Sequence, residues 1–212
     1  MVYPIVRLIV IPIYKLWLRK FYGLGNVPKD KPFIIAANHS SYYDTVLPHV
    51  IIIPKINKKI HALVNSRYWS NPVTKMILDL GACVPVYVKN EKNSKKKNKE
   101  AFEKALGYLK KGDPVLVFPE GKRSPDGKLQ KAYTGIAKIC LESKLPVLPL
   151  GIIGASKVLP KGKIFLRFKR CEAKIGKLMY FDKYKKNDKT LEEITRKIMK
   201  EIARLIGQEY KY

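Results

Sequence analysis

Two residues in the first quarter of the chain, His39 and Asp44, have the types and spacing needed for general base catalysis. A carboxylate beside a histidine fixes the tautomer and orientation of the imidazole, which can then remove a proton from a hydroxyl group. On a straight helix, residues five apart lie about 140° from each other and cannot meet. The pair therefore predicts a strand-to-helix turn, with His39 in the loop and Asp44 in the first helical turn.

The two serines between these residues have a structural interpretation. Ser40 or Ser41 would cap the helix by accepting a hydrogen bond from its first turn, and we favour this role over that of a nucleophile. Taken alone, a histidine and an aspartate at this spacing occur often by chance. The alternative is an ordinary surface-loop histidine near a capping acid.

A second segment with chemical potential, FPEGKRS, begins at Phe118. It places an acid, a glycine, two cations and a hydroxyl in a row: Glu120, Gly121, Lys122, Arg123 and Ser124. Cationic side chains and backbone N–H groups at a glycine-bearing turn are suited to binding a phosphate group. An ordinary charged turn is the alternative.

Short apolar runs precede both polar segments. Residues 33–37 and 114–118 are typical of buried strands. Because such runs alternate with helical patterns, the sequence predicts an α/β fold with a mostly parallel central sheet flanked by helices. Ligands of such sheets bind beyond the carboxyl ends of the strands, which is where both polar segments would lie.

The remaining elements follow from periodicity and from proline and glycine positions. Helices are expected over 45–53 (ended by Pro54), 72–80 (stopped by Gly81), 101–109, 131–143 and 191–205, and strands over 60–64, 82–88 and 147–153, with 164–169 pairing with 173–175. We find no internal repeat, and residues 23–212 are expected to form a single α/β domain.

Residues 1–22 form an apolar N-terminal segment interrupted by Arg7 and Lys15. A span needs roughly 20 mostly apolar residues, so we prefer a membrane-associating helical segment that lies in the interface and bends at Pro12. On such a helix Arg7, Lys15 and Arg19 share about one third of the circumference. Aromatic residues typical of the headgroup level accompany them: Tyr3, Trp17, Phe21 and Tyr22.

Other interpretations of this segment stay open. A helix docked on the protein's own core is equally compatible with the pattern, and a tilted span is a minority alternative. No small-residue cleavage site follows the apolar stretch, so a secretory signal peptide is not expected.

Net charge is the outlier of the composition. With 43 Lys plus Arg against 17 Asp plus Glu, the formal charge is +26. This favours anionic partners such as nucleic acid, lipid headgroups or acidic substrates, although a lysine-rich genome would explain part of it. The basic run over 89–100 is expected to be mainly a solvated loop, and could otherwise contact a membrane or an acidic carrier protein. The three cysteines form no C-x-x-C pair and are expected to be buried, reduced thiols.

In combination, the polar segments resemble the blocks of the glycerophospholipid acyltransferases, and most closely the bacterial 1-acylglycerol-3-phosphate acyltransferases. The N-H-x4-D block of that family matches Asn38, His39 and Asp44. Its F-P-E-G-x-R-S block matches the segment from Phe118 to Ser124, with Lys122 where threonine is commoner. Both blocks follow an apolar run, as the resemblance requires.

Two further blocks are matched less closely. Residues 81–89 resemble a G-x5-R block but carry Lys89 near the position of the arginine. Residues 147–151 correspond to a V-P-V-like strand. The blocks occur in the order of the family and span residues 38–151.

The resemblance implies transfer of a fatty acyl group from acyl-CoA or acyl carrier protein to the free hydroxyl of lysophosphatidic acid. His39 would be the base and Asp44 would orient it, with no metal or other cofactor implied. The implied substrate-binding set is Glu120, Gly121, Lys122, Arg123, Ser124 and Lys89. The expected location is the cytoplasmic face of the cell membrane, on an anionic lipid surface, with no nucleic acid as partner.

Three alternatives remain at this level. The acceptor could be another lysolipid, glycerol 3-phosphate or a hydroxyl without a phosphate. A basic nucleic-acid-binding protein would explain the charge but not the ordered blocks. A catalytically silent membrane scaffold would not need His39 and Asp44.

Overall fold

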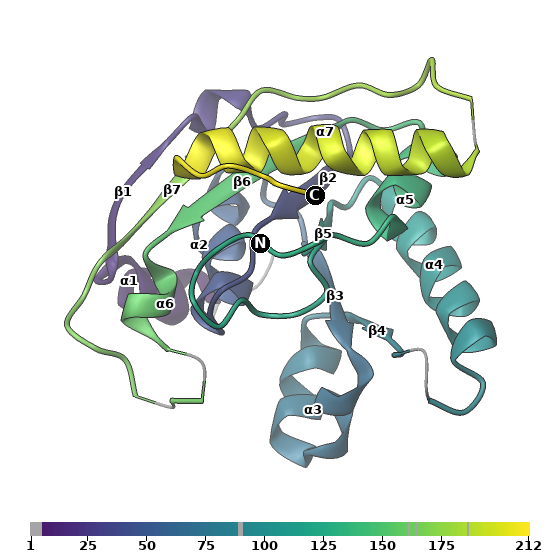
Figure 1. Cartoon of the computed structure of the whole chain (residues 1–212). Coiled ribbons are helices and arrows are strands. Elements are labelled where there is room, and N and C mark those ends of the chain that lie inside the picture. Colours follow the sequence, from purple (N-terminus) through teal and green to yellow (C-terminus); the bar gives the residue numbers. More distant parts are fainter. Residues whose placement is uncertain (1–5, 89–90, 161, 164, 186) are drawn as a thin grey trace.

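The computed structural model describes residues 6–88, 91–160, 162–163, 165–185 and 187–212. Within them the chain forms a seven-stranded sheet in the order β1-β7-β6-β2-β5-β3-β4 (Figure 1). The strands are Leu18–Tyr22 (β1), Ile34–Ala37 (β2), His61–Asn65 (β3), Val84–Val86 (β4), Val115–Val117 (β5), Val147–Ile153 (β6) and Cys171–Ile175 (β7).

Helices cover both faces of this sheet. They are α1 (Ile11–Lys15), α2 (Tyr43–Ile56), α3 (Pro72–Leu80), α4 (Ser94–Lys110), α5 (Gly135–Ser143), α6 (Ala155–Val158) and α7 (Asp188–Ile206). Three short turns complete the set: the π-helical η1 (Val6–Val10) and the 3₁₀-helical η2 (Leu24–Asn26) and η3 (Ser66–Ser70).

The sheet is parallel through its larger part. Neighbouring strands from β6 through β2, β5 and β3 to β4 all pair parallel, whereas β7 is antiparallel to β6 and parallel to β1. This confirms the expected α/β fold with a mostly parallel sheet. Because the five parallel strands point the same way, the loops that follow them meet at one edge of the sheet.

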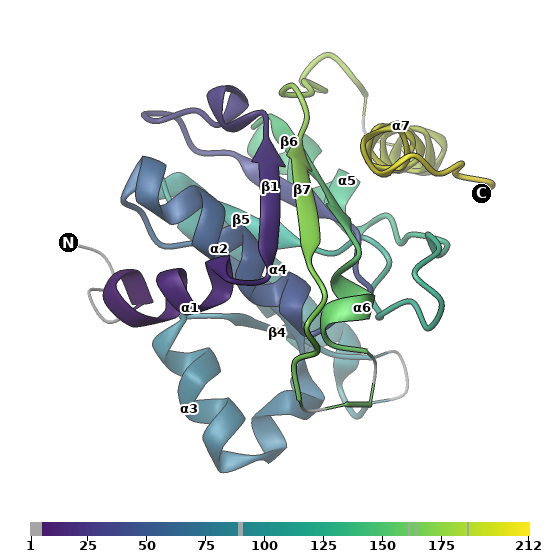
Figure 2. The same cartoon turned by 90° about the vertical axis from the view of Figure 1, so that its left-hand side faces the viewer.

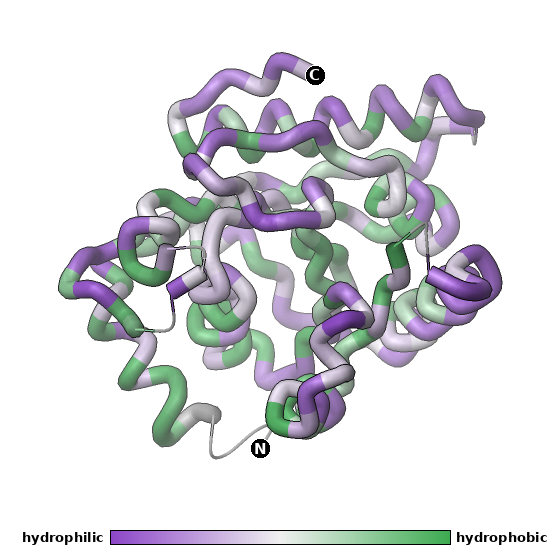
Figure 3. The backbone as a smooth tube through the Cα atoms, turned by 60° about the horizontal axis from the view of Figure 1, so that its bottom comes forward, coloured by the Kyte–Doolittle hydropathy of each residue, from purple (hydrophilic) through white to green (hydrophobic). Residues whose placement is uncertain are grey.

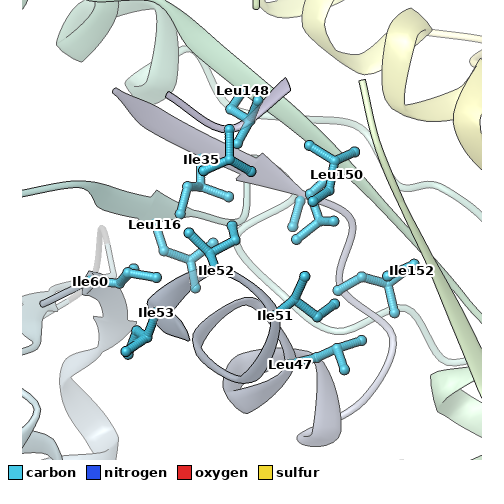
Figure 4. Packing of buried hydrophobic residues seen from close by; sticks show 14 of the residues in the cluster. Ile35, Leu47, Ile51, Ile52, Ile53, Ile60, Leu116, Leu148, Leu150 and Ile152 are labelled. Atoms are coloured by element: carbon cyan, nitrogen blue, oxygen red, sulfur yellow. The ribbon is translucent and has the colours of Figure 1, made fainter. Parts of the chain in front are cut away.

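The central strand β2 is apolar throughout because it faces two cores. Ile35 and Ala37 belong to a cluster built largely with α2 (Figure 4), and Ile34 and Ala36 belong to a second cluster built with α4, α5 and α7. Successive residues of a strand point to opposite faces, so only an uninterrupted apolar run can serve both clusters.

The sequence predicted several elements correctly and misplaced others. Helix α3 and strand β6 have the predicted bounds, and α7 buries the predicted apolar stripe. Strand β4 covers only three of the seven residues expected, and α5 begins at Gly135, four residues later than expected. Among the described residues of 164–169 there is no strand; β7 pairs with β6 and β1 instead.

Helix α2 continues past the proline that was expected to end it. Pro54 lies inside the helix, which runs to Ile56. Because Ile51, Ile52 and Ile53 are all buried, their packing outweighs the one hydrogen bond that a proline cannot donate.

The basic run after β4 is also more ordered than expected. Helix α4 begins at Ser94, so Lys95, Lys96, Lys97 and Lys99 lie on a helix and not in a loop. This helix is anchored by Ala105, Leu106 and Leu109, whose burial in the second core stabilises the helix that continues into the charged run.

The N-terminal segment is helical over only part of its length. A helix over Ile11–Lys15 follows η1, but Leu18–Tyr22 forms the edge strand β1, because these residues find backbone partners on β7. Pro12 is the second residue of α1, which follows directly on η1, so the predicted bend there stays a prediction. Tyr3 and the side chain of Arg7 lie outside the described residues. No helix in the described ranges is both long and apolar enough to cross a membrane.

The cysteines differ slightly from expectation. Cys140 and Cys171 are buried free thiols, but Cys83 is only partly buried. Burial raises the pKa of the Cys83 thiol to about 11 and that of each of the other two to about 12, so all three are poor nucleophiles near neutral pH.

Candidate active site

The loop between β2 and α2 brings the predicted histidine and aspartate together. His39 lies in the loop and Asp44 in the first turn of α2, with Nδ1 of the imidazole 3.3 Å from Oδ2 of the carboxylate. Asp44 is fully buried, whereas the His39 side chain is partly exposed. When Nδ1–H donates to Asp44, Nε2 carries the lone pair and can accept a proton.

Backbone N–H groups hold the carboxylate in position. Oδ2 of Asp44 accepts hydrogen bonds from the N–H groups of Ser40 (2.5 Å) and Ser41 (2.7 Å). The hydroxyl of Ser41 accepts the N–H of Tyr43, the first residue of α2, but Tyr42 occupies the N-cap position, so neither serine is the N-cap that the sequence predicted. The loop thus folds back on itself as the local argument predicted.

The second polar segment, residues 118–124, holds the histidine loop in place through hydrogen bonds and a ring contact. Glu120, which lies in the loop after β5, accepts the His39 N–H through Oε1 at 2.8 Å and the Gln130 N–H through Oε2 at 2.7 Å. The N–H of Ser124 donates to the carbonyl oxygen of His39 at 2.8 Å. The imidazole stacks on Phe118, with the ring centroids 4.1 Å apart. Neighbouring strands β2 and β5 make these contacts possible.

Glu120 is buried, and its environment changes its acidity. Burial raises the pKa of Glu120 to about 7, even though its two backbone hydrogen bonds act in the opposite direction. The contacts of both carboxylate oxygens are with backbone N–H groups. Binding of the acceptor by Glu120 therefore stays a prediction, while the structure gives this residue a part in positioning His39.

The other residues of the second segment occupy distinct environments. Gly121 has a left-handed φ of +64°, and a Cβ there would lie 2.9 Å from the ring of Tyr133. Ser124 is buried and its hydroxyl donates to Asp126, whereas Lys122 is exposed. Lys89 lies outside the described residues.

Arg123 is buried among tyrosines. Its guanidinium lies 3.5 Å from the centroid of the Tyr42 ring, and Nη2 donates to the hydroxyl of Tyr68 at 3.4 Å. Nη1 is buried and has no hydrogen-bond partner among the described residues. A buried guanidinium with an unused donor suits an oxyanion such as a phosphate.

A second arginine joins this cluster. Nη2 of Arg67 donates to the hydroxyl of Tyr68 at 2.9 Å, and that hydroxyl donates to Tyr42. Burial raises the pKa of the Tyr68 phenol, but hydrogen bonds to its neighbours and the nearby guanidinium charges outweigh it, so the pKa lies below its ordinary value. In the part of the chain that the structure describes, neither Arg67 nor Arg123 forms an ion pair with a carboxylate.

Comparison with known proteins decides the family. The family model described as Acyltransferase matches residues 19–153, from the second residue of β1 to the end of β6, and this range includes the whole histidine loop. This chain belongs to the acyltransferase family. Within that match lie both polar segments and the arginine–tyrosine cluster.

Relatives of this acyltransferase-family chain carry consistent names. It is similar to the 1-acyl-sn-glycerol-3-phosphate acyltransferase of Bacillus subtilis (strain 168), with 30% identity over 69% of this chain and 70% of the relative. It is 26% identical to 1-acyl-sn-glycerol-3-phosphate acyltransferase BAT2, chloroplastic, of Brassica napus, over 72% of this chain. The match covers only 42% of that plant protein, so the chain spans about two fifths of its length.

A solved structure shares the fold. The crystal structure of the 1-acyl-sn-glycerophosphate (LPA) acyltransferase PlsC from Thermotoga maritima matches with a TM-score of 0.69 over 96% of this chain and 82% of that chain, at 22% identity. At this identity the likeness establishes the fold, which agrees with the mostly parallel sheet described above.

Sequence reasoning missed several residues of this candidate site. Asn38 matched the family block but had no assigned role. Its amide accepts the N–H of Ile152 at 2.7 Å and donates to the carbonyl oxygen of the same residue at 2.9 Å, which ties the histidine loop to β6. Arg67 and Tyr68 were not singled out. They follow a predicted strand, so the rule that drew attention to the other two loops could have found them.

Proposed function

We propose that this chain transfers a fatty acyl group from an acyl thioester to the free hydroxyl of 1-acylglycerol 3-phosphate, giving phosphatidic acid. The observation that carries the proposal is the His39–Asp44 pair beside Arg123, a buried cation with an unused donor. A general base next to an anion site is what an acceptor with both a hydroxyl and a phosphate requires. The names of the relatives support the same reaction.

In the mechanism we infer, His39 acts twice. Nε2 removes the proton of the acceptor hydroxyl as its oxygen attacks the thioester carbonyl carbon. Asp44 keeps Nδ1–H oriented and stabilises the imidazolium that forms. Collapse of the tetrahedral intermediate breaks the carbon–sulfur bond, and the imidazolium returns its proton to the departing thiolate. The products are the ester and the free thiol, with no acyl-enzyme intermediate.

The acceptor phosphate would lie against the arginine–tyrosine cluster. Nη1 of Arg123 is the donor without a partner, and Arg67 adds a second cation across the Tyr68 hydroxyl. Charge-assisted hydrogen bonds from guanidinium groups to phosphate are about twice as strong as neutral ones. Lys122 is exposed nearby in sequence and remains a proposed auxiliary cation, as does Lys89.

The donor remains a choice between acyl-CoA and acyl carrier protein. Both are acidic, and the exposed lysines at the start of α4 would attract either. Other lysolipids and glycerol 3-phosphate are alternative acceptors, since all share a hydroxyl close to a phosphate.

We also propose that the protein works at the cytoplasmic face of the cell membrane. The charge of +26 favours an anionic lipid surface, and η1 and α1 expose Leu8, Ile9 and Ile13. The N-terminal segment would therefore lie on the membrane beside the active site.

The test follows thiol release by purified protein given lysophosphatidate and a long-chain acyl thioester in lipid vesicles, with His39→Ala beside the wild type. Release that needs the lysolipid and falls at least about 10³-fold in the variant is expected for loss of a general base. A thermal unfolding curve for both proteins separates loss of chemistry from loss of fold. Equal activity in the variant contradicts the mechanism. A wild type active only with glycerol 3-phosphate or another lysolipid contradicts the proposed acceptor.

A further inference from the structure

Helix α3 has an apolar face that the protein itself does not cover. Val73, Met76, Ile77 and Leu80 are each 58–67% exposed, and no residue of this helix is buried. Their spacing of three or four residues places them on one side of the helix. Side chains of this size in a regular stripe would normally face a core or another apolar partner.

The loop between α6 and β7 exposes a second group of apolar side chains. Phe165 is 80% exposed and Phe168 is fully exposed. The sequence of residues 159–170, LPKGKIFLRFKR, interleaves these rings with basic residues and contains no acidic residue. Aromatic rings can enter a lipid interface while neighbouring cations contact anionic headgroups.

The N-terminal segment supplies the third group. Leu8, Ile9, Ile13 and Leu16 are exposed on η1, α1 and the residue that follows. In Figures 1 and 2, which share their vertical axis, α1, α3 and the described parts of the 159–170 loop all lie toward the lower side of the molecule. Figure 3 turns this side forward and shows apolar stretches next to hydrophilic ones. Three segments that are distant in sequence and carry exposed apolar residues therefore lie toward the same side of the molecule.

Hydrogen bonds join two of these segments to the histidine loop. The hydroxyl of Ser41 donates to the carbonyl oxygen of Leu159, the first residue of the 159–170 loop, at 2.7 Å. The hydroxyl of Tyr43 donates to the carbonyl oxygen of Tyr14 in α1, and the two rings stack with centroids 5.0 Å apart. These exposed segments are thus neighbours of the catalytic base.

The third segment is joined through Tyr42, the residue between those two. Its hydroxyl accepts from Tyr68 in η3, and the carbonyl oxygen of Tyr68 accepts from the hydroxyl of Thr74 in α3. Three consecutive residues, 41–43, where the histidine loop meets α2, therefore each contact one of these segments or, for α3, the turn η3 that precedes it. The three segments that carry the exposed apolar residues therefore all adjoin the histidine loop.

We propose that η1–α1, α3 and the 159–170 loop form a single membrane-docking face around the active site, and that its occupant is an anionic lipid bilayer. The proposal extends the N-terminal attachment to two segments with no role so far. It depends on the proposed function in one respect, which is that the acceptor is a lipid. Lys163, Arg167 and Lys169 give the face the charge that an anionic surface attracts.

The charge also argues against a second copy as the occupant. Two chains of +26 brought together through faces flanked by lysine and arginine would repel each other. An anionic bilayer presents the opposite charge and an apolar interior at the same surface. The acceptor could then reach Arg123 and His39 without leaving the lipid.

The experiment compares Met76→Ser/Ile77→Ser and Phe165→Ser/Phe168→Ser with the full wild-type chain. Proteins are sedimented with vesicles of phosphatidylcholine containing about 30% phosphatidylglycerol. We expect each double variant to bind at least about fivefold more weakly, and the combination of both at least about 25-fold. All four side chains are exposed, so the variants should melt as the wild type does.

Tyr180→Ser is the matched control. Tyr180 is equally exposed but follows Met179, which pairs with Val147 at the start of β6, on the edge of the sheet opposite the active site. Its vesicle binding should equal that of the wild type. Thiol release with a short-chain, water-soluble acceptor should be unchanged in every variant, because the face delivers lipid and takes no part in the chemistry.

Several results would overturn the proposal. One is a wild type that does not sediment with the vesicles, and another is double variants that sediment as the wild type does. A wild-type dimer that the double variants dissociate, with vesicle binding unaffected, would assign the face to a second copy. If the double variants lose vesicle binding but the wild type does not acylate lysophosphatidate, the docking face is supported and the proposed function is refuted.

Discussion

At the scale of single residues, one buried oxygen atom organises the histidine loop between β2 and α2. Oδ2 of Asp44 contacts Nδ1 of His39 and the N–H groups of Ser40 and Ser41. Only an acceptor can serve all three donors at once. This one acceptor oxygen therefore fixes both the shape of the loop and the orientation of the imidazole, and a carboxylate, unlike an amide, presents an acceptor whichever way it turns.

The first prediction concerns Asp44→Asn. An amide group can present its N–H₂ to the imidazole and favour the wrong tautomer, so kcat should fall by about 10³–10⁴ with KM changed less than about threefold. Steady-state thiol release measures both constants. Asp188→Asn, an exposed change at the start of α7, is the control and should keep the wild-type rate. An Asp44→Asn variant with more than about one tenth of that rate would contradict this role.

The second prediction concerns the acidity of Glu120. Burial raises the pKa to about 7 in the folded chain, above its value near 4.5 in the unfolded chain. The folded state thus holds the proton more tightly. The stability that this proton contributes is complete below about pH 4.5 and is lost as the pH rises through about 7.

Urea unfolding at several pH values tests this linkage. From pH 5 to 8 the free energy of unfolding of the wild type should fall by about 1–3 kcal/mol relative to Glu120→Gln, which cannot titrate. Parallel pH profiles for the two proteins would show that Glu120 has an ordinary pKa.

At the scale of elements, the short turn η3 brings a hydroxyl between two arginines. Tyr68→Phe removes the oxygen that accepts from Arg67 and Arg123 but keeps the ring. If the cluster holds the acceptor phosphate, KM for lysophosphatidate should rise about tenfold with little change in kcat. KM for an acceptor alcohol without a phosphate should not change. Tyr180→Phe, on the opposite edge, is the control, and equal KM values for Tyr68→Phe and wild type would argue against a phosphate site here.

Packing of α7 on β6 depends on a glycine. A Cβ at Gly151 would lie 2.7 Å from Ile206 and 2.8 Å from Leu205, so Gly151→Ala must displace the helix. We expect a loss of about 1–3 kcal/mol in the free energy of unfolding. Gly107→Ala, inside α4 with open space around its Cβ, should instead gain about 0.5–1 kcal/mol. Chemical unfolding of both variants measures the two changes in the free energy of unfolding. Equal changes would contradict the close contact between Gly151 and α7.

At the scale of the whole molecule, charge and apolar exposure should act on lipid in different ways. Raising the salt concentration from about 0.1 M to 0.5 M shortens the screening length, so binding to anionic vesicles should weaken at least about tenfold. The weaker binding to neutral phosphatidylcholine vesicles, carried by apolar side chains, should change little. The same salt sensitivity for both vesicle types would mean that the net charge of +26 does not act on the membrane.

The sequence alone determined those features whose causes are local. His39 and Asp44 are five residues apart, and the turn that joins them follows from the strand and helix patterns on either side. The amphipathic stripe of α7 and the apolar run of β2 likewise follow from side-chain periodicity, because burial on one or two faces imposes it. These patterns were sufficient for the fold class and for the meeting of His39 with Asp44.

Only the tertiary structure decided which distant segments meet. Strand order places Glu120 under His39 and Asn38 against Ile152, and no local pattern encodes that order. The same holds for β1, whose residues were predicted to be helical but pair with β7 in the folded chain. It also holds for α2, which continues past Pro54. In each case long-range packing or backbone pairing outweighs a local preference of about 1 kcal/mol per residue, or about 3 for a proline, and that balance is fixed only when the chain is folded.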